Sequence, residues 1–184
     1  IALAQAALDT GADVTLISAA EHLAPPAGAK LIPVKTADQM HQAVMTEIPG
    51  SDALIMAAAV ADFRPAFPSD QKIKKQNGLP VIELEPTADI LQDVLESRKK
   101  SGFPRLVIGF AAESQDLISN AKKKLMDKGL DLIIANDILA ADAGFEVDTN
   151  RVTLVYPDGR QKSLAIMTKD EVSEQIMDQV IEWL

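Results

Sequence analysis

Apolar residues follow two patterns along this chain of 184 residues: short uninterrupted runs, and longer stretches with helical spacing. The runs are rich in Val, Ile, Leu and Ala, which is typical of strands buried on both faces of a sheet. We predict such strands or extended segments at residues 14–18, 31–34, 53–59, 105–111 and 131–136. The helical spacing predicts helices at residues 1–8, 36–48, 89–100, 115–128 and 168–183.

Strands that alternate with helices are typical of an α/β fold, in which helices cover a mainly parallel sheet. We therefore predict a doubly wound α/β fold and a single domain that comprises residues 1–184. Apolar runs at 151–156 and 162–166 flank the turn sequence Pro157-Asp158-Gly159-Arg160. This arrangement predicts an antiparallel hairpin near the C-terminus. Thr168, with Glu171 three residues later, predicts a capping box for the last helix.

The first residues already have the pattern of a helix. In a doubly wound fold, a strand and a phosphate-binding turn precede such a helix. Neither a G-x-G-x-x-G fingerprint nor a Walker-type loop occurs later in the sequence. We therefore expect the N-terminal strand and the glycine-rich loop to be missing from these 184 residues.

Residues 60–86 interrupt the alternation and hold four of the ten prolines. Asp62 and Arg64 come directly after an apolar run, and Lys72-Ile73-Lys74-Lys75 follows ten residues later. Ligands of open α/β sheets bind beyond the carboxyl ends of the strands, and long loops in compact domains are usually functional. The segment is therefore interpreted either as a flap over a ligand site or as a solvated loop.

Composition and net charge limit the classes of ligand, partner and catalytic group that this chain can have. The net charge of −9 argues against a nucleic-acid binder, although a few local lysines can still hold a small anion. No apolar run is long enough to predict a membrane span. There is no cysteine, and neither His22 nor His41 has a partner spaced for a metal site or a catalytic triad. We expect a cytoplasmic protein without a membrane or nucleic-acid partner.

Four motifs occur along the chain in this order: A-A-V-A-D-F-R-P, K-I-K-K, G-F-A-A-E and D-L-I-I-A-N-D. Their order and spacing resemble those of phosphopantothenate–cysteine ligase, the ligase half of the bacterial bifunctional coenzyme A biosynthesis protein. The resemblance covers essentially the whole chain. It implies a Rossmann-like fold, a homodimer, and CTP used with Mg²⁺ or Mn²⁺. It also implies 4′-phosphopantothenate and cysteine as the other substrates.

In the reaction that the resemblance implies, the carboxylate of 4′-phosphopantothenate attacks the α-phosphate of CTP and forms an acyl-cytidylate. The amino group of cysteine then attacks the acyl carbon and releases CMP. Such chemistry depends on positioning and on cancelling phosphate charge, and it needs no protein nucleophile. The absence of cysteine residues from this chain agrees with such a mechanism. FMN is expected only on a decarboxylase domain that would be fused upstream.

The resemblance also implies which residues contact the nucleotide. Lys72 matches the lysine of the flap at 60–86, whereas Lys74 and Lys75 either share the phosphate charge or are solvated. Three roles are open for Asp62: it accepts a hydrogen bond from the cytosine amine, it contacts the ribose, or it caps Arg64. The matched nucleotide-binding positions are Met56, Ala57, Ala58, Asp62, Lys72, Ala88, Asp89, Ile90, Leu91, Phe110, Lys124 and Lys128. For the apolar members the alternative is ordinary core, and for Asp89, Lys124 and Lys128 it is a charge suited to a helix end.

The catalytic asparagine of that family lies in a serine- and glycine-rich loop before the first helix, and nothing here matches it. We therefore expect little or no amide formation by these 184 residues alone. One alternative is a non-catalytic nucleotide-binding module. Another is a dinucleotide-dependent oxidoreductase, which the missing glycine fingerprint disfavours. The sequence leaves open the choice between CTP and ATP, and it identifies no metal ligands.

Overall fold

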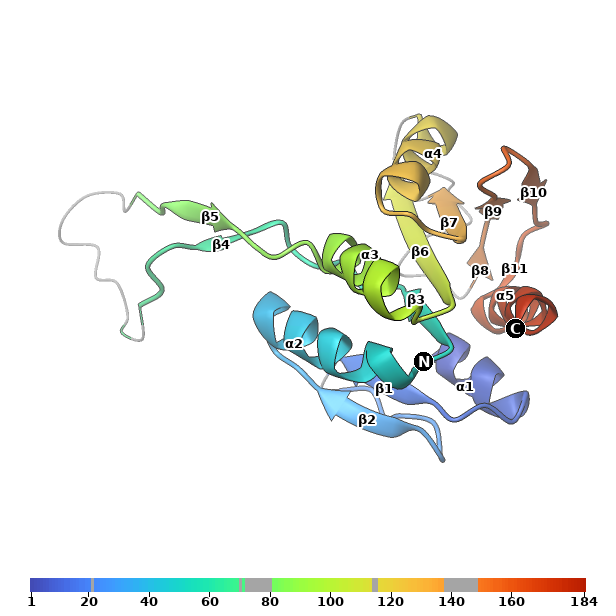
Figure 1. The fold of residues 1–184 in the computed structure, drawn as a ribbon, viewed down its shortest axis with the longest axis horizontal. Coiled ribbons are helices and arrows are strands. Elements are labelled where there is room, and N and C mark those ends of the chain that lie inside the picture. Colours follow the sequence, from blue (N-terminus) through green and yellow to red (C-terminus); the bar gives the residue numbers. More distant parts are fainter. Residues whose placement is uncertain (21, 70, 72–80, 114–115, 138–148) are drawn as a thin grey trace.

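Figure 1 shows the computed structural model, which describes residues 1–20, 22–69, 71, 81–113, 116–137 and 149–184. Its body is built around a five-stranded sheet with the strand order β10-β9-β7-β6-β3. β3 (Ala53–Met56), β6 (Leu106–Glu113) and β7 (Leu132–Asp137) run parallel to one another. β9 (Val152–Val155) and β10 (Gln161–Ser163) add the predicted antiparallel hairpin. The α/β class and the mostly parallel sheet are thereby confirmed.

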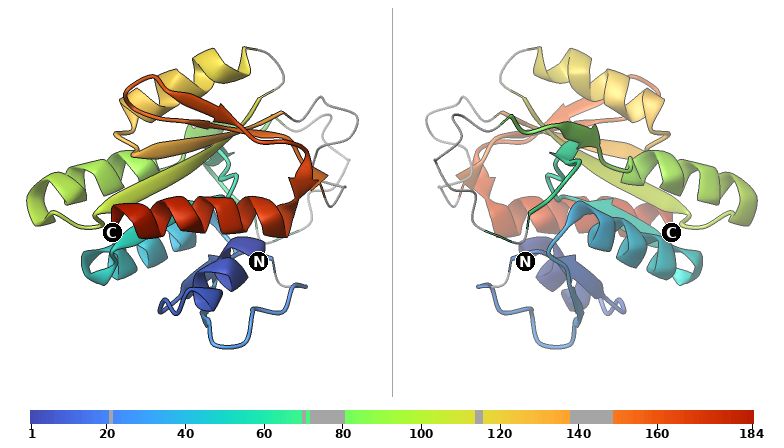
Figure 2. Two further views of the ribbon diagram at one scale, coloured as in Figure 1. Left: turned by 90° about the vertical axis from the view of Figure 1, so that its right-hand side faces the viewer. Right: turned by 90° about the vertical axis from the view of Figure 1, so that its left-hand side faces the viewer.

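Helices lie on both faces of this sheet, so the body has three layers (Figure 2). α2, α3 and α4 pack on one face through side chains that include Val44, Val94 and Leu125. α1 and α5 pack on the other face through Ala6 and Ile176. The helices are α1 (Ala2–Asp9), α2 (Ala37–Glu47) with a short 3-10 turn η1 (Ile48–Gly50), α3 (Ile90–Ser101), α4 (Leu117–Asp127) and α5 (Lys169–Trp183).

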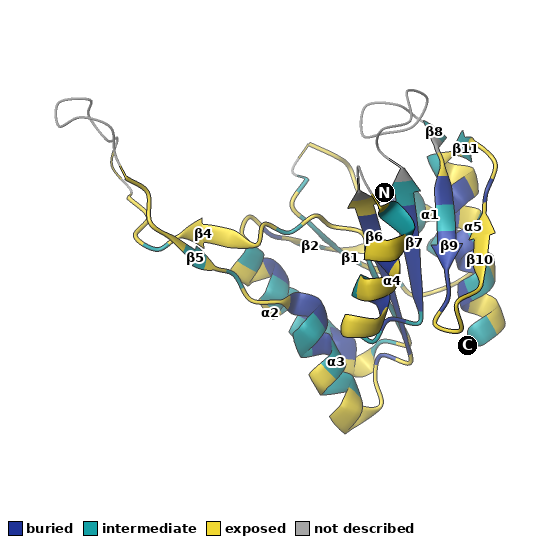
Figure 3. Ribbon diagram, turned by 90° about the horizontal axis from the view of Figure 1, so that it is seen from above, coloured by how far each residue is buried: buried dark blue, intermediate teal, exposed yellow. Residues whose placement is uncertain are grey.

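The core lies where the apolar runs of the sequence placed it (Figure 3). Along β7, Leu132, Ile133 and Ile134 are completely buried, although successive side chains of a strand point to opposite faces. Ile133 belongs to the core under α2, α3 and α4, whereas Leu132 and Ile134 belong to the core under α1 and α5. Burial on both faces explains why this strand reads as a continuous apolar run and does not alternate.

β1 (Thr15–Ser18) and β2 (Lys30–Pro33) pair in parallel with each other and form a second, two-stranded sheet. β3 pairs with β6 along one edge and with no other strand in the described part of the chain. The first two predicted strands therefore do not join the main sheet by hydrogen bonds. A further short pair, β8 (Thr149–Asn150) with β11 (Met167–Thr168), precedes α5.

Two local predictions have different outcomes. The capping box is confirmed: the Thr168 hydroxyl accepts the N–H of Glu171 at 3.2 Å, and the Glu171 carboxylate accepts the N–H of Thr168 at 2.7 Å. The predicted strand at 53–59, in contrast, ends at Met56. Of the residues that follow, Ala58, Val60 and Ala61 line a pocket that is described below.

The predicted flap at 60–86 contains two short antiparallel strands, β4 (Phe63–Pro65) and β5 (Leu84–Pro86), which we call the arm. Figure 1 shows the arm reaching away from the body, on the side of α2. Lys72, Lys74 and Lys75, and the turn predicted at Asn77-Gly78, lie outside the described residues. None of the helices in the described ranges is long and apolar enough to cross a membrane.

Candidate functional site

A pocket of about 230 Å³ opens where β3 ends, between the beginning of α3 and the later turns of α4. Its wall is formed by Met56, Ala58, Val60, Ala61, Asp62, Thr87, Ala88, Asp89, Ile90, Leu91, Phe110, Lys124 and Lys128. Residues from four separate segments of the chain thus meet at one place. Ligands of open α/β sheets bind at such carboxyl ends of parallel strands.

Ten of the twelve nucleotide-contacting positions expected from the sequence line this pocket. Of the other two, Lys72 lies outside the described residues, and Ala57 lies between two lining residues without lining the pocket itself. The structure adds Val60, Ala61 and Thr87, which the sequence analysis did not single out. Val60 and Ala61 lie within a quoted motif, but small apolar residues otherwise indicate the core of a strand. Thr87 was indicated only by its place directly before the matched positions 88–91.

Lys124 and Lys128 enter the pocket from one face of α4. The Lys124 amine donates a hydrogen bond to the backbone carbonyl of Phe110 at 2.9 Å. Lys128 forms an ion pair with Asp89. The Phe110 side chain packs against the core under α1 and α5, so its carbonyl is the part that meets Lys124. Phe110 lies within β6, which continues to Glu113, two residues beyond the end predicted for this strand at residue 111.

Asp89 connects the lysines with the beginning of α3. As the N-cap residue of α3, it accepts the N–H of Gln92 at 3.1 Å. Burial by itself would raise the pKa of the Asp89 carboxyl. The hydrogen bonds from Lys128 and from the Gln92 N–H, together with the charges of Lys128 and Lys124, outweigh burial and hold that pKa below its ordinary value of 3.8. The carboxylate is therefore ionised throughout the neutral range.

We expect Asp89→Asn to remove a contribution to stability that depends on pH. Because the folded-state pKa is lowered, this contribution is fully present above the ordinary pKa of 3.8 and is lost as the pH falls through the lower pKa of the folded state. Asn is also a good N-cap, so the substitution removes the charge and keeps the cap. Urea unfolding should show wild type more stable by roughly 0.5–1 kcal/mol at pH 7, as for a partly exposed ion pair. An undiminished difference at pH 3 would contradict the assignment.

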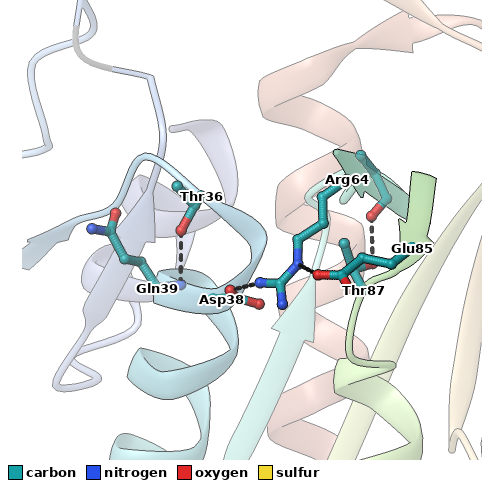
Figure 4. A network of polar contacts seen from close by, with 7 residues as sticks. Thr36, Asp38, Gln39, Arg64, Glu85 and Thr87 are labelled. Atoms are coloured by element: carbon teal, nitrogen blue, oxygen red, sulfur yellow. Dashed lines mark hydrogen bonds and ion pairs between the residues drawn. The ribbon is translucent and has the colours of Figure 1, made fainter. Parts of the chain in front are cut away.

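The arm emerges directly from the pocket wall. Asp62 precedes β4 and Thr87 follows β5, and the backbone carbonyl of Asp62 accepts the Thr87 N–H at 2.9 Å. The Thr87 hydroxyl donates to the carbonyl of Ala61 at 2.6 Å. In Figure 4, Arg64 contacts the carboxylates of Asp38 and Glu85. Within the described residues it forms no ion pair with Asp62, so the interpretation of Asp62 as a cap for Arg64 is wrong.

The formal charges of the described lining residues cancel, since Lys124 and Lys128 face Asp62 and Asp89. A triphosphate would therefore need further positive charge, from a metal ion or from lysines outside the described ranges. No cluster of three or more His, Cys, Asp or Glu side chains suited to a metal occurs among the residues that the structure describes. A divalent ion held by phosphates and one or two carboxylates fits this wall better than a site made of protein ligands alone.

A second cavity, of about 290 Å³, lies near the beginning of β6 and the end of α5. Its polar side chains already pair with protein groups. Arg160 contacts Asp158, Asp131 contacts Arg98, and the Tyr156 hydroxyl donates to Gln179 at 3.0 Å. Although this cavity is larger, it lies at the amino ends of β6 and β7. The pocket at the end of β3 is the better candidate site, because ligands of open α/β sheets bind at the carboxyl ends of the strands.

Fold and pocket together define an open α/β domain with a pocket at the carboxyl ends of its parallel strands. Residues 1–184 match the family model "DNA/pantothenate metabolism flavoprotein C-terminal domain", and the chain belongs to this family.

Among curated relatives, "Coenzyme A biosynthesis bifunctional protein CoaBC" of Bacillus subtilis is 46% identical over 180 residues, which are 97% of this chain and 43% of the relative. The protein of the same name from Vibrio cholerae is 41% identical over 183 residues, 98% of this chain and 45% of the relative. The chain thus spans less than half the length of these relatives. A crystal structure of the C-terminal domain of CoaBC superimposes with a TM-score of 0.78 at 36% identity, over 97% of this chain and 78% of that one.

Proposed function

We propose that this chain is the ligase domain that joins 4′-phosphopantothenate to cysteine at the expense of CTP, a step of coenzyme A biosynthesis. The observation that carries this proposal is the pocket at the end of β3, where ten of the twelve expected nucleotide contacts meet. The names of the curated relatives, which are coenzyme A biosynthesis proteins, support the same pathway. The protein is proposed to work in the cytoplasm.

The described residues suit the first step. The substrate carboxylate attacks the α-phosphorus of CTP, the bond to the β-phosphate oxygen breaks, and pyrophosphate leaves. Lys124 and Lys128 supply positive charge, and the free N–H groups at the beginning of α3 favour an anion. Mg²⁺ or Mn²⁺ would cancel charge on the phosphates, and Asp62 and Asp89 are the carboxylates of the described wall that would help to hold it.

In the second step, the cysteine nitrogen forms a bond to the acyl carbon, CMP leaves with the bonding electron pair, and the nitrogen loses a proton. The product is an amide. Positioning of the two substrates supplies most of the rate in such transfers. FMN has no part in either step, and we place it on a separate upstream decarboxylase domain.

The proposal is tested by pyrophosphate release from the full-length protein with 4′-phosphopantothenate and CTP. We expect release that requires 4′-phosphopantothenate, and amide formation that also requires cysteine. ATP at equal concentration should support a slower rate. Saturable CTP binding without pyrophosphate release would instead identify a non-catalytic nucleotide-binding module, and a protein that does not bind CTP would contradict the proposal.

We further propose that the protein is a homodimer in which a second copy covers the arm. Apolar side chains in and beside the arm strands are exposed (Figure 3): Phe63 of β4 is 61% exposed, Phe67, two residues after β4, is 81% exposed, and Val81, three residues before β5, is 91% exposed. Exposed apolar strands with open edges are otherwise an aggregation hazard, and pairing with an identical arm covers them symmetrically.

We expect Phe67→Ser combined with Val81→Ser to convert the dimer to a monomer, because the two substitutions remove apolar area that the second copy would bury. Light scattering coupled to size-exclusion chromatography measures the mass directly. Leu23→Ser is the matched control, since Leu23 is 48% exposed but lies outside the arm. A wild-type protein that is already monomeric at micromolar concentration would refute the dimer.

A further inference from the structure

We propose that Arg64 is a positioning residue, which latches the arm to α2 and thereby fixes the part of the pocket wall formed by Asp62 and Thr87. This inference rests on the proposed function only where it concerns CTP. Neither the family match nor the names of the relatives assigns a role to Arg64. Three features of the molecule support this role: the two carboxylates that Arg64 joins, the exposure of the three side chains, and the continuity of arm and pocket.

The first feature is the bridge itself (Figure 4). Arg64 lies on β4, and its Nε donates to Glu85 Oε1 on β5 at 2.7 Å. Its Nη1 contacts Asp38 Oδ2, which lies 26 residues earlier in the first turn of α2. One planar guanidinium thus joins the two strands of the arm to each other and to a helix of the body. A lysine substituted for Arg64 would carry a single ammonium group, which does not reproduce the fork of N–H donors that a guanidinium presents to two carboxylates.

The second feature is the exposure of the bridge. The side chains of Arg64, Asp38 and Glu85 are 46%, 53% and 42% exposed. Ion pairs of this kind add little to global stability, because water competes for both partners. Their effect is larger on a segment that has few other contacts with the body. Arg64 is therefore expected to influence the orientation of the arm more than the stability of the fold.

The third feature is that the arm and the pocket wall are continuous. Phe63 of β4 directly follows Asp62, and Thr87 directly follows Pro86 of β5. The hydrogen bonds of Thr87 to Asp62 and Ala61 close the base of the arm. A change in the orientation of the arm therefore moves residues on two sides of the pocket. If only a fraction of molecules holds the arm correctly, the apparent affinity for a ligand falls by that fraction.

The test compares Arg64→Ala and Asp38→Asn with wild type in the full-length protein. The first readout is hydrogen exchange of the peptide that contains Thr87, whose amide bond closes the base of the arm. We expect exchange to be roughly three- to ten-fold faster in both variants, the range for losing one or two partly exposed ion pairs. This readout needs no nucleotide, so it tests the latch whether or not the protein uses CTP.

The second readout is steady-state pyrophosphate release. The KM for CTP should rise in proportion as the fraction of molecules with a correctly held arm falls, while kcat changes less than roughly two-fold. Arg64→Lys should fall between wild type and Arg64→Ala in both readouts. The matched control is Arg105→Ala, because Arg105 forms a comparably exposed ion pair with Asp52, outside the pocket wall and the arm. It should leave both readouts unchanged.

Unaltered hydrogen exchange in Arg64→Ala and Asp38→Asn would overturn the latch. Faster exchange with an unchanged KM would overturn the link to the pocket, while the proposed ligase function would stand. A wild-type protein that neither binds nor consumes CTP would instead refute the proposed function and the part of the inference that concerns CTP. The exchange result would then still decide whether Arg64 holds the arm.

Discussion

Lys124→Met in the full-length protein is expected to raise the KM for CTP by about 10- to 100-fold. Hydrogen bonds from a charged donor contribute roughly 1.5–3 kcal/mol, which corresponds to this range of affinity. The Lys124 amine is held at the pocket by the Phe110 carbonyl at 2.9 Å, so little ordering is needed when an anion binds. Methionine keeps a similar apolar stem and removes only the charge and the donors.

Pyrophosphate release as a function of CTP concentration measures this effect. Lys123→Met is the matched control, because Lys123 is exposed on the same helix and does not line the pocket. Thermal unfolding of both variants should stay close to wild type, which excludes a general loss of structure. Equal KM values for Lys124→Met and Lys123→Met would show that Lys124 does not contact the nucleotide.

The second large effect concerns stability: Ile133→Ala should lower the free energy of unfolding by about 2–5 kcal/mol. Ile133 is completely buried in β7 and packs in the core between the sheet and α2, α3 and α4. Its truncation leaves a cavity in the middle of the sheet, where neighbouring strands on both sides prevent the backbone from closing it. Urea unfolding measures the loss, with the fluorescence of Trp183, the one tryptophan of the chain, as the probe.

Ile181→Ala provides the control, since Ile181 is 52% exposed on α5. The same methyl groups are removed, but most of their surface already contacts water, so the expected loss is about 1 kcal/mol or less. A similar loss in both variants would show that the core around β7 tolerates truncation, in conflict with the packing described above.

Secondary structure was predictable wherever a local sequence pattern is compatible with a single structure. The pair Thr168 and Glu171 satisfies the free N–H groups at a helix start, and the structure shows both expected bonds. The continuous apolar run of β7 also meant burial on both faces. The strand predicted at 53–59 is confirmed for residues 53–56, but its end was misplaced, since small apolar residues suit a buried strand and a pocket wall equally well. The structure ends the strand at Met56 and turns the chain into the pocket.

The site was only partly predictable. Family resemblance brought out Lys124, Lys128 and Asp89 separately. That Lys128 pairs with Asp89, 39 residues earlier, follows only from the packing of α4 beside the beginning of α3. The same holds for Arg64, whose local neighbours in the sequence gave no indication of Asp38 as its partner.

The sequence by itself therefore determined the α/β class, most of the elements and the family resemblance, because propensity, capping and hydrophobic period depend on residues close together in the chain. The tertiary structure decided which distant side chains meet: the lysines of α4 with Asp89, and the arm with α2 through Arg64. Those contacts depend on how the sheet and its helices pack. Patterns among neighbouring residues in the sequence do not determine that packing geometry.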